Sequence, residues 1–310
     1  MKMSINSMLL ISTLSVAVWG CAAADTVVGV DPANVKTVTA NVNANALQIV
    51  GSANSEDSTK FDFYKDHSYD IQQEINDAIH EALTIQNEID RVEKIAKKYA
   101  DYSSDAVTPE EKKIADGLAR TVWETELNTL CTRVVGKIYD VKKREKLLED
   151  QRSWNAIKEE VMKKSIGEDK NGEVLDSKLV SEFMENTTRS RCLVLAYELA
   201  QSNDEEFKFP ERSVYGTFVD MQDSDTIGSI LVTRKGADGS NEAVFSIHQM
   251  AVLEGTFKDK GDGELEFTGK SSNVKGIIKI NGWKDATLEI TQSNDKIYNA
   301  GLSYTFDFAF

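Results

Sequence analysis

Apolar residues between positions 67 and 102 recur at alternating spacings of four and three. They are Ile71, Ile75, Ala78, Ala82, Ile85, Ile89, Val92, Ala96 and Tyr99. This spacing places the apolar side chains on one face of a helix over about four heptads. The pattern predicts a helix whose seam pairs with a second helix.

A second helix is predicted to begin at Thr108. The residues Thr108-Pro109-Glu110-Glu111 combine a capping hydroxyl, a proline at the first helical position and a glutamate at the third. Because the loop 101–107 is short, we expect the two helices to form a hairpin within the chain. The alternative is a homodimer that pairs through the seam 71–99.

Residues 124–199 carry two further helical patterns. In the first half, apolar residues recur at helical spacings, which include three and four, at Leu147, Leu148, Trp154, Ile157 and Val161. In the second half, they do so at Val180, Phe183, Met184, Leu195 and Leu199. The polar segment Gly167 to Glu173 predicts the turn between these helices, and the whole helical domain is expected over residues 61–203.

The apolar period changes to two from Phe209 onward, which predicts strands. Alternating pairs include Ile230/Val232, Phe245/Ile247, Leu265/Phe267, Ile278/Ile280 and Leu288/Ile290, with clusters of Gly, Asn, Asp and Ser between them. About eight short strands at this spacing are typical of an antiparallel β-barrel or sandwich. The fold class is therefore α+β, with the all-β domain at residues 207–310 and its closing strand at Tyr304, Phe306 and Phe308.

The N-terminus has the pattern of a secretory signal over residues 1–24, with Lys2 before an apolar run. The segment 14–21, ending in Gly20-Cys21, resembles a bacterial lipobox, which implies lipidation of Cys21. Ordinary cleavage after Ala22 to Ala24 is the alternative. Residues 25–60 predict a flexible tether. We therefore expect a lipid-anchored protein of the bacterial cell envelope, periplasmic or surface-exposed.

Export leaves Cys131 and Cys192 in an oxidising compartment, which favours one disulfide. An unbroken helix 109–165 would hold the two cysteines about 25 Å apart at 1.5 Å rise per residue, too far for a bridge. The disulfide thus requires a helix break between Gly136 and Lys143, capped by Asp140, with the first and third helices parallel. Two separate buried thiols are the alternative.

Charge limits the class of partner. The chain carries 51 acidic and 36 basic residues, a net charge of −15. Such a surface repels nucleic acid and anionic lipid and attracts cationic proteins. We therefore expect no nucleic-acid function.

The sequence contains no recognisable catalytic or cofactor motif. His67, His80 and His248 lack metal-ligand spacing, and neither a nucleophile elbow nor a phosphate-binding glycine loop is present. The segment Asp169 to Gly172 imitates part of a calcium loop but lacks two of its oxygen ligands. We expect no enzyme activity, no metal and no cofactor.

The order of residues in 124–199 resembles the N-terminal domain of the LprI-type lysozyme-inhibitor family. The matching residues are Leu127, Asn128, Gln151, Trp154, Thr188, Arg191 and Leu195. Cys131 stands where that family usually has Tyr, and Lys158 where it usually has Arg. The final strands bear a weaker similarity to β-barrel modules that follow such domains. We interpret the matching residues as structural.

The resemblance implies a non-catalytic lipoprotein that binds a cationic protein such as c-type lysozyme, with inhibition of that protein as a further expectation. Lys235 to Asn241 and Lys258 to Gly263 are candidate hairpin tips for that contact. The alternative is an envelope scaffold that assembles through the seam 71–99. A secreted hydrolase is a third hypothesis, which would require desolvated carboxylates in a pocket.

Overall fold

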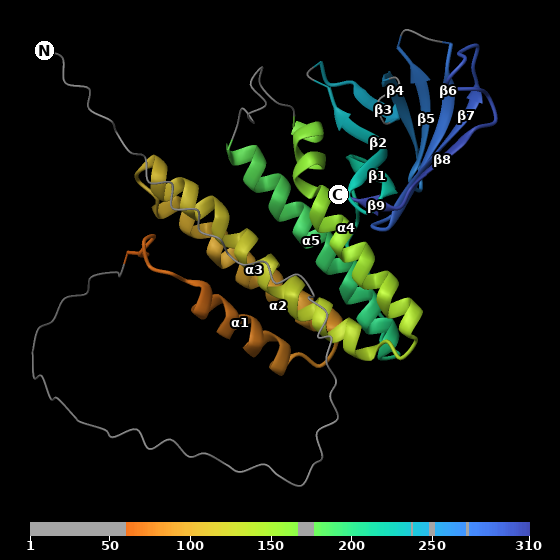
Figure 1. Ribbon diagram of the computed structural model, residues 1–310. Coiled ribbons are helices and arrows are strands. Elements are labelled where there is room, and N and C mark those ends of the chain that lie inside the picture. The colour runs from red at the N-terminus through yellow and green to blue at the C-terminus, as the bar shows by residue number, and fades with distance from the viewer. Residues whose placement is uncertain (1–59, 167–176, 237, 248–251, 271–272) are drawn as a thin grey trace, which may run out of the picture.

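Helices fill the first part of the described chain and strands fill the second, which confirms the α+β class (Figure 1). The computed structural model describes residues 60–166, 177–236, 238–247, 252–270 and 273–310. The helices are α1 (Ser68–Glu81), α2 (Ile85–Asp101), the 3₁₀ helix η1 (Tyr102–Asp105), α3 (Pro109–Lys137), α4 (Val141–Ile166) and α5 (Ser177–Ser202).

The predicted helix over residues 67–102 is two helices, so the continuous seam was wrong. The chain turns at Ala82–Thr84, where Thr84 caps α2 by accepting a hydrogen bond from the backbone N–H of Asn87 at 3.2 Å. The carboxylate of Glu205 accepts a second one from the N–H of Ile85 at 2.7 Å. The apolar residues of α1 and α2 are buried in the same core as those of α3. The apolar residues of the seam therefore pack against other helices of the same chain.

Local signals set the ends of α3 and α4. Thr108 and Glu111 form the predicted capping box at the start of α3. The predicted break is present, because α3 ends at Lys137 and Asp140 accepts a hydrogen bond from the backbone N–H of Lys143 at the start of α4. Helices α3 and α5 run parallel (Figure 1). The turn 167–173 lies outside the described residues, as does the segment resembling a calcium loop.

The predicted Cys131–Cys192 disulfide is wrong. Cys192 is a free, buried thiol that donates a hydrogen bond to the carbonyl of Trp123 at 3.4 Å. Trp123 precedes Cys131 by eight residues, about 12 Å along α3. The helix break that the bridge required therefore exists. Cys192, however, lies beside Trp123, nearer to the N-terminus of α3 than Cys131, so the two cysteines are not level with each other.

The strands form a nearly closed antiparallel barrel in which each strand from β1 to β8 pairs with its neighbour in the sequence. They are β1 (Gly216–Asp223), β2 (Thr226–Lys235), β3 (Asn241–Ile247), β4 (Val252–Gly261), β5 (Glu264–Gly269), β6 (Lys275–Asn281), β7 (Asp285–Gln292), β8 (Ser303–Phe306) and β9 (Phe308–Ala309). The closing strand is interrupted at Asp307: β8 pairs with β7, and β9 pairs with β1.

The interruption at Asp307 divides the aromatic residues of the closing strand between two cores. Phe306 is buried in the barrel interior, among apolar side chains from the other strands. Phe308 and Phe310 instead pack into the helical core, together with outward-facing Val219 and Ile230 of β1 and β2. The barrel and the helices therefore share one apolar interface, with the barrel beside α4 and α5 (Figure 1).

The predictions about export concern residues 1–59, which lie outside the described residues. The signal peptide, the lipidation of Cys21 and the tether therefore stay predictions. Within the described part of the chain, no helix combines the length and the apolar character that a membrane crossing needs.

Candidate functional site

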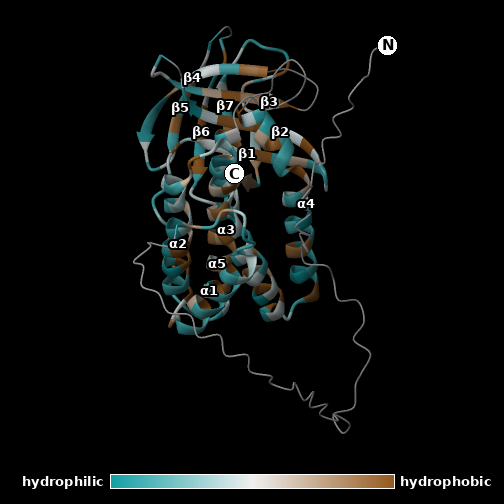
Figure 2. Cartoon of the chain, turned by 90° about the vertical axis from the view of Figure 1, so that its left-hand side faces the viewer, coloured by the Kyte–Doolittle hydropathy of each residue, from teal (hydrophilic) through white to brown (hydrophobic). Residues whose placement is uncertain are grey.

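A cleft of about 840 Å³ lies where α4, α5, the end of α3 and the barrel meet. Helix α4 stands to one side of the other helices beneath the barrel (Figure 2). Its residues Leu147 and Trp154 form one wall, Arg191 and Leu195 of α5 form another, and Phe308 of β9 closes the barrel side. The volume is in the range typical of pockets for small ligands.

Several of the sequence-predicted site residues meet at this cleft. Arg191 Nε donates a hydrogen bond to Gln151 Oε1 at 2.8 Å, which joins α5 to α4. Trp154 follows Gln151 by three residues and so lies on the same face of α4. Leu195 follows Arg191 by four residues on α5 and also lines the cleft.

The remaining sequence-predicted residues lie apart from the cleft lining. Leu127 is buried in the helical core, and Thr188 is buried with its hydroxyl donating to the carbonyl of Met184 at 2.7 Å. Both positions are buried, as a role in packing requires. Asn128 is exposed on α3, so its side chain contributes nothing to the core.

Two buried N–H groups at the cleft have no hydrogen-bond partner among the described residues. They are Nε1 of Trp154, a residue only 1% exposed, and Nη2 of Arg191. Burial lowers the pKa of Arg191 to about 10, against the opposing effect of Asp150. The guanidinium therefore stays charged at neutral pH, although the acceptor of its hydrogen bond is a neutral amide.

Charges of both signs line the cleft. The cations are Lys143, Lys146, Arg191 and Lys284, and the carboxylates are Asp150, Glu198 and Asp307. Burial raises the pKa of Asp150, and Arg191 and Lys146 act in the opposite direction. The described lining is thus less acidic than the chain as a whole, which carries a net charge of −15.

Trp154 is fixed by contacts on its ring faces. The ring of Phe310 stacks on it with centroids 6.1 Å apart and an interplanar angle of 6°. The ammonium of Lys158 lies 5.4 Å from the indole centroid. The positive charge of Lys158 is therefore close to the face of the indole ring.

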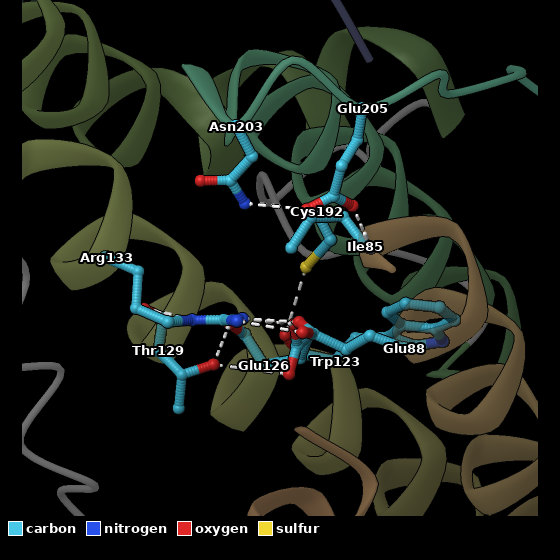
Figure 3. Close-up of polar contacts among 9 residues, drawn as sticks. All are labelled: Ile85, Glu88, Trp123, Glu126, Thr129, Arg133, Cys192, Asn203 and Glu205. Carbon is cyan, nitrogen blue, oxygen red and sulfur yellow. Dashed lines mark hydrogen bonds and ion pairs between the residues drawn. The ribbon is translucent and has the colours of Figure 1, made fainter. Parts of the chain in front are cut away.

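A second polar cluster is buried between α2 and α3 (Figure 3). Arg133 forms a bidentate ion pair with Glu88, one hydrogen bond of which runs from Nη1 to Oε2 at 2.8 Å. Its Nη2 also lies 3.3 Å from Oε1 of Glu126, whose other oxygen accepts from Thr129. Burial, reinforced by the charge of Glu88, raises the pKa of the Glu126 carboxyl well above its usual range.

The geometry of this cluster is that of a structural ion pair. Glu88 is 2% exposed and Glu126 is fully buried, and neither lines the cleft. Within the described chain, no group of three or more His, Cys, Asp or Glu side chains is placed to hold a metal. Nearby Cys192 is also a poor nucleophile, because burial raises its thiol pKa (Figure 3).

The sequence contained a signal for this cluster that our interpretation did not use. Glu88 stands between Ile85 and Val92 in the apolar stripe of α2, and Glu126 stands four residues from both Val122 and Leu130 in that of α3. A charged residue inside an apolar stripe predicts a buried ion pair. The cleft lacked any such linear signal, since its walls come from segments far apart in the chain.

Comparisons of the chain with family models, with curated proteins and with solved structures found no match.

Proposed function

We propose that this chain is a non-catalytic binding protein of the bacterial cell envelope, and that its partner is a cationic protein of the c-type lysozyme class. The observation that carries the proposal is the contact between Gln151 and Arg191 beside Trp154. Three residues of the LprI-like pattern, separated by up to 40 positions, form one unit. This supports the resemblance, since residues of a shared pattern are expected to meet in the fold.

Charge supports the same partner. With a net charge of −15, the chain attracts basic proteins over distances comparable to the Debye length, and opposite charge speeds their encounter. Helix α1 carries Asp70, Glu74, Asp77 and Glu81 and no Lys or Arg of its own. Three of these carboxylates form ion pairs outside the helix, Asp70 with Lys65, Glu74 with Lys98 and Glu81 with Arg91, which leaves Asp77 without an ion pair among those described. The helix lies on the side of the bundle away from the barrel (Figure 1).

The test is the rate at which a c-type lysozyme clears a suspension of bacterial cell walls. Increasing amounts of the purified protein are expected to lower the rate to a plateau near equimolar ratio. Raising the ionic strength from roughly 50 to 300 mM is expected to slow the association about tenfold. An unchanged rate at a large molar excess excludes inhibition.

Two hairpins allow the contact to be located. The β2–β3 turn follows Lys235, the last residue of β2, and the β4–β5 turn follows Gly261, the residue after Lys260. Lys235→Ala and Lys260→Ala each remove one cation from one turn. Weakened inhibition in one variant alone identifies the hairpin that enters the enzyme, whereas equal inhibition by both assigns the contact to another face, such as α1.

A further inference from the structure

The cleft between α4, α5 and the barrel contains a positive charge that the described chain does not neutralise by direct pairing. Arg191 is partly buried, its Nε donates to the neutral amide of Gln151, and its Nη2, which is itself buried, has no partner among the described residues. A buried cation is unfavourable unless an anion or several acceptors compensate it. The site therefore favours an anionic occupant.

Trp154 adds a second donor to the same site. Its residue is 1% exposed, and its Nε1–H also lacks an acceptor among the described residues. An indole N–H can only donate, so it too requires an acceptor atom. The guanidinium and the indole N–H are both donors that a carboxylate oxygen can satisfy, and guanidinium groups bind carboxylates strongly.

The rest of the cleft is suited to an apolar chain. Val134, Ile138, Leu147, Val194, Leu195 and Phe308 supply apolar surface around the polar end. The cleft volume of about 840 Å³ exceeds what a carboxylate alone would occupy. Lys143, Lys146 and Lys284 add positive charge to the lining.

We propose that this cleft binds an amphipathic carboxylate, whose carboxylate contacts Arg191 and Trp154 and whose apolar chain lies along Leu147 and Leu195. This small-molecule site is separate from the contact with a cationic protein and does not depend on it. Asp150 also lines the cleft and opposes an anion, because its charge competes for Arg191.

Isothermal titration calorimetry with sodium decanoate below its micelle concentration tests the proposal, with decyltrimethylammonium as the probe of opposite charge. The wild-type protein is expected to bind decanoate saturably and in preference to the cation. Trp154→Phe keeps the ring but removes the N–H donor, and is expected to weaken decanoate about five- to tenfold. Asp150→Asn removes the competing charge and is expected to tighten it about two- to fivefold.

The sharpest variant is Gln151→Glu, which supplies Arg191 with a carboxylate of its own. It is expected to weaken decanoate at least tenfold. Gln201→Glu is the matched control, because it adds the same charge to the same cleft from an exposed position on α5 and is expected to change affinity less than threefold. Circular dichroism checks that each variant is folded.

Three outcomes would overturn the proposal. The first is the absence of saturable decanoate binding to the wild-type protein, and the second is stronger binding of decyltrimethylammonium. The third is equal decanoate affinity in the wild type, Trp154→Phe and Asp150→Asn. This comparison does not need Gln151→Glu, so the proposal can be tested even if that variant does not fold. Lysozyme inhibition is measured on the same samples, so failure of either proposal is seen independently of the other.

Discussion

The ring of Phe310 lies nearly parallel to the indole of Trp154, with 6.1 Å between the centroids. This contact joins the closing strand of the barrel to α4. The backbone of Phe310 is fixed as well, since its N–H donates to the carbonyl of Thr217 at 2.8 Å. The stacked pair therefore couples the barrel to the wall of the cleft.

Phe310→Ala is expected to lower the free energy of unfolding by about 2–4 kcal/mol. Phe310 is 8% exposed, and removing a buried aromatic ring loses its burial and leaves a cavity. Urea denaturation followed by circular dichroism measures the change. Leu302→Ala is the control, because Leu302 is 40% exposed on the same segment and its loss should cost under about 0.5 kcal/mol. Equal midpoints for the two variants would show that the stacked pair does not stabilise the fold.

Cys192 is expected to resist iodoacetamide in the native protein at pH 8. Its thiol is buried, donates to the carbonyl of Trp123 and has a raised pKa, so little thiolate is present to react. In denaturant without reductant it should be fully alkylated, as mass spectrometry of the Cys192 peptide will show. If the peptide is instead linked to another cysteine and is released only by reduction, the result contradicts the structure and supports the predicted disulfide.

Much of the fold follows from local patterns. The capping residues around Thr108 and the helix break before Asp140 are short-range effects, and the period-two segments alternate as half-buried strands must. The turn at Ala82–Thr84 was missed because the four-three spacing continues through it. Thr84 is a good capping residue. Because the apolar spacing continues on both sides of it, however, the pattern predicts one continuous helix.

The candidate site was harder to predict because it is formed by long-range packing. Gln151, Trp154 and Arg191 were identified from their order in the sequence and interpreted as structural, which is consistent with the observed hydrogen bond. Their unpartnered donors become visible only when α4, α5 and the closing strand are placed together. The sequence also did not show that the aromatic residues before and after Asp307 belong to different hydrophobic cores, because their alternation continues across Asp307.

Cys21 is expected to carry lipid in the native cell. Metabolic labelling with a radioactive fatty acid should mark the wild-type protein and leave Cys21→Ser unlabelled, because the thioether requires the cysteine sulfur. The wild-type protein should also partition into detergent, since several acyl chains anchor a protein stably. Cys192→Ser controls for the loss of a cysteine elsewhere and should stay labelled. An unlabelled wild-type protein would favour ordinary cleavage after Ala22 to Ala24.

The stability of the protein is expected to fall as the pH rises above about 4.5, through the effect of Glu126. Its pKa is raised in the folded state by burial and by Glu88, so the folded protein binds this proton more tightly than the unfolded chain. Between the unfolded and the folded pKa, stability then decreases with a slope of up to about 1.4 kcal/mol per pH unit. Below the unfolded pKa both states are protonated, and this contribution no longer changes with pH.

Glu126→Gln removes the titration while keeping a similar shape and a hydrogen-bond donor for Glu88. The variant is expected to be more stable than the wild type at pH 7, with the difference shrinking as the pH falls toward 4.5. Urea midpoints measured from pH 4 to 8 report this directly. Glu159→Gln, at an exposed position of α4, provides the matched control and should show no such convergence. The prediction is contradicted if the free energies of unfolding of the wild type and of Glu126→Gln differ by the same amount at every pH. Glu126 would then have the same pKa in the folded and unfolded states, and Arg133 alone would compensate the charges of both carboxylates.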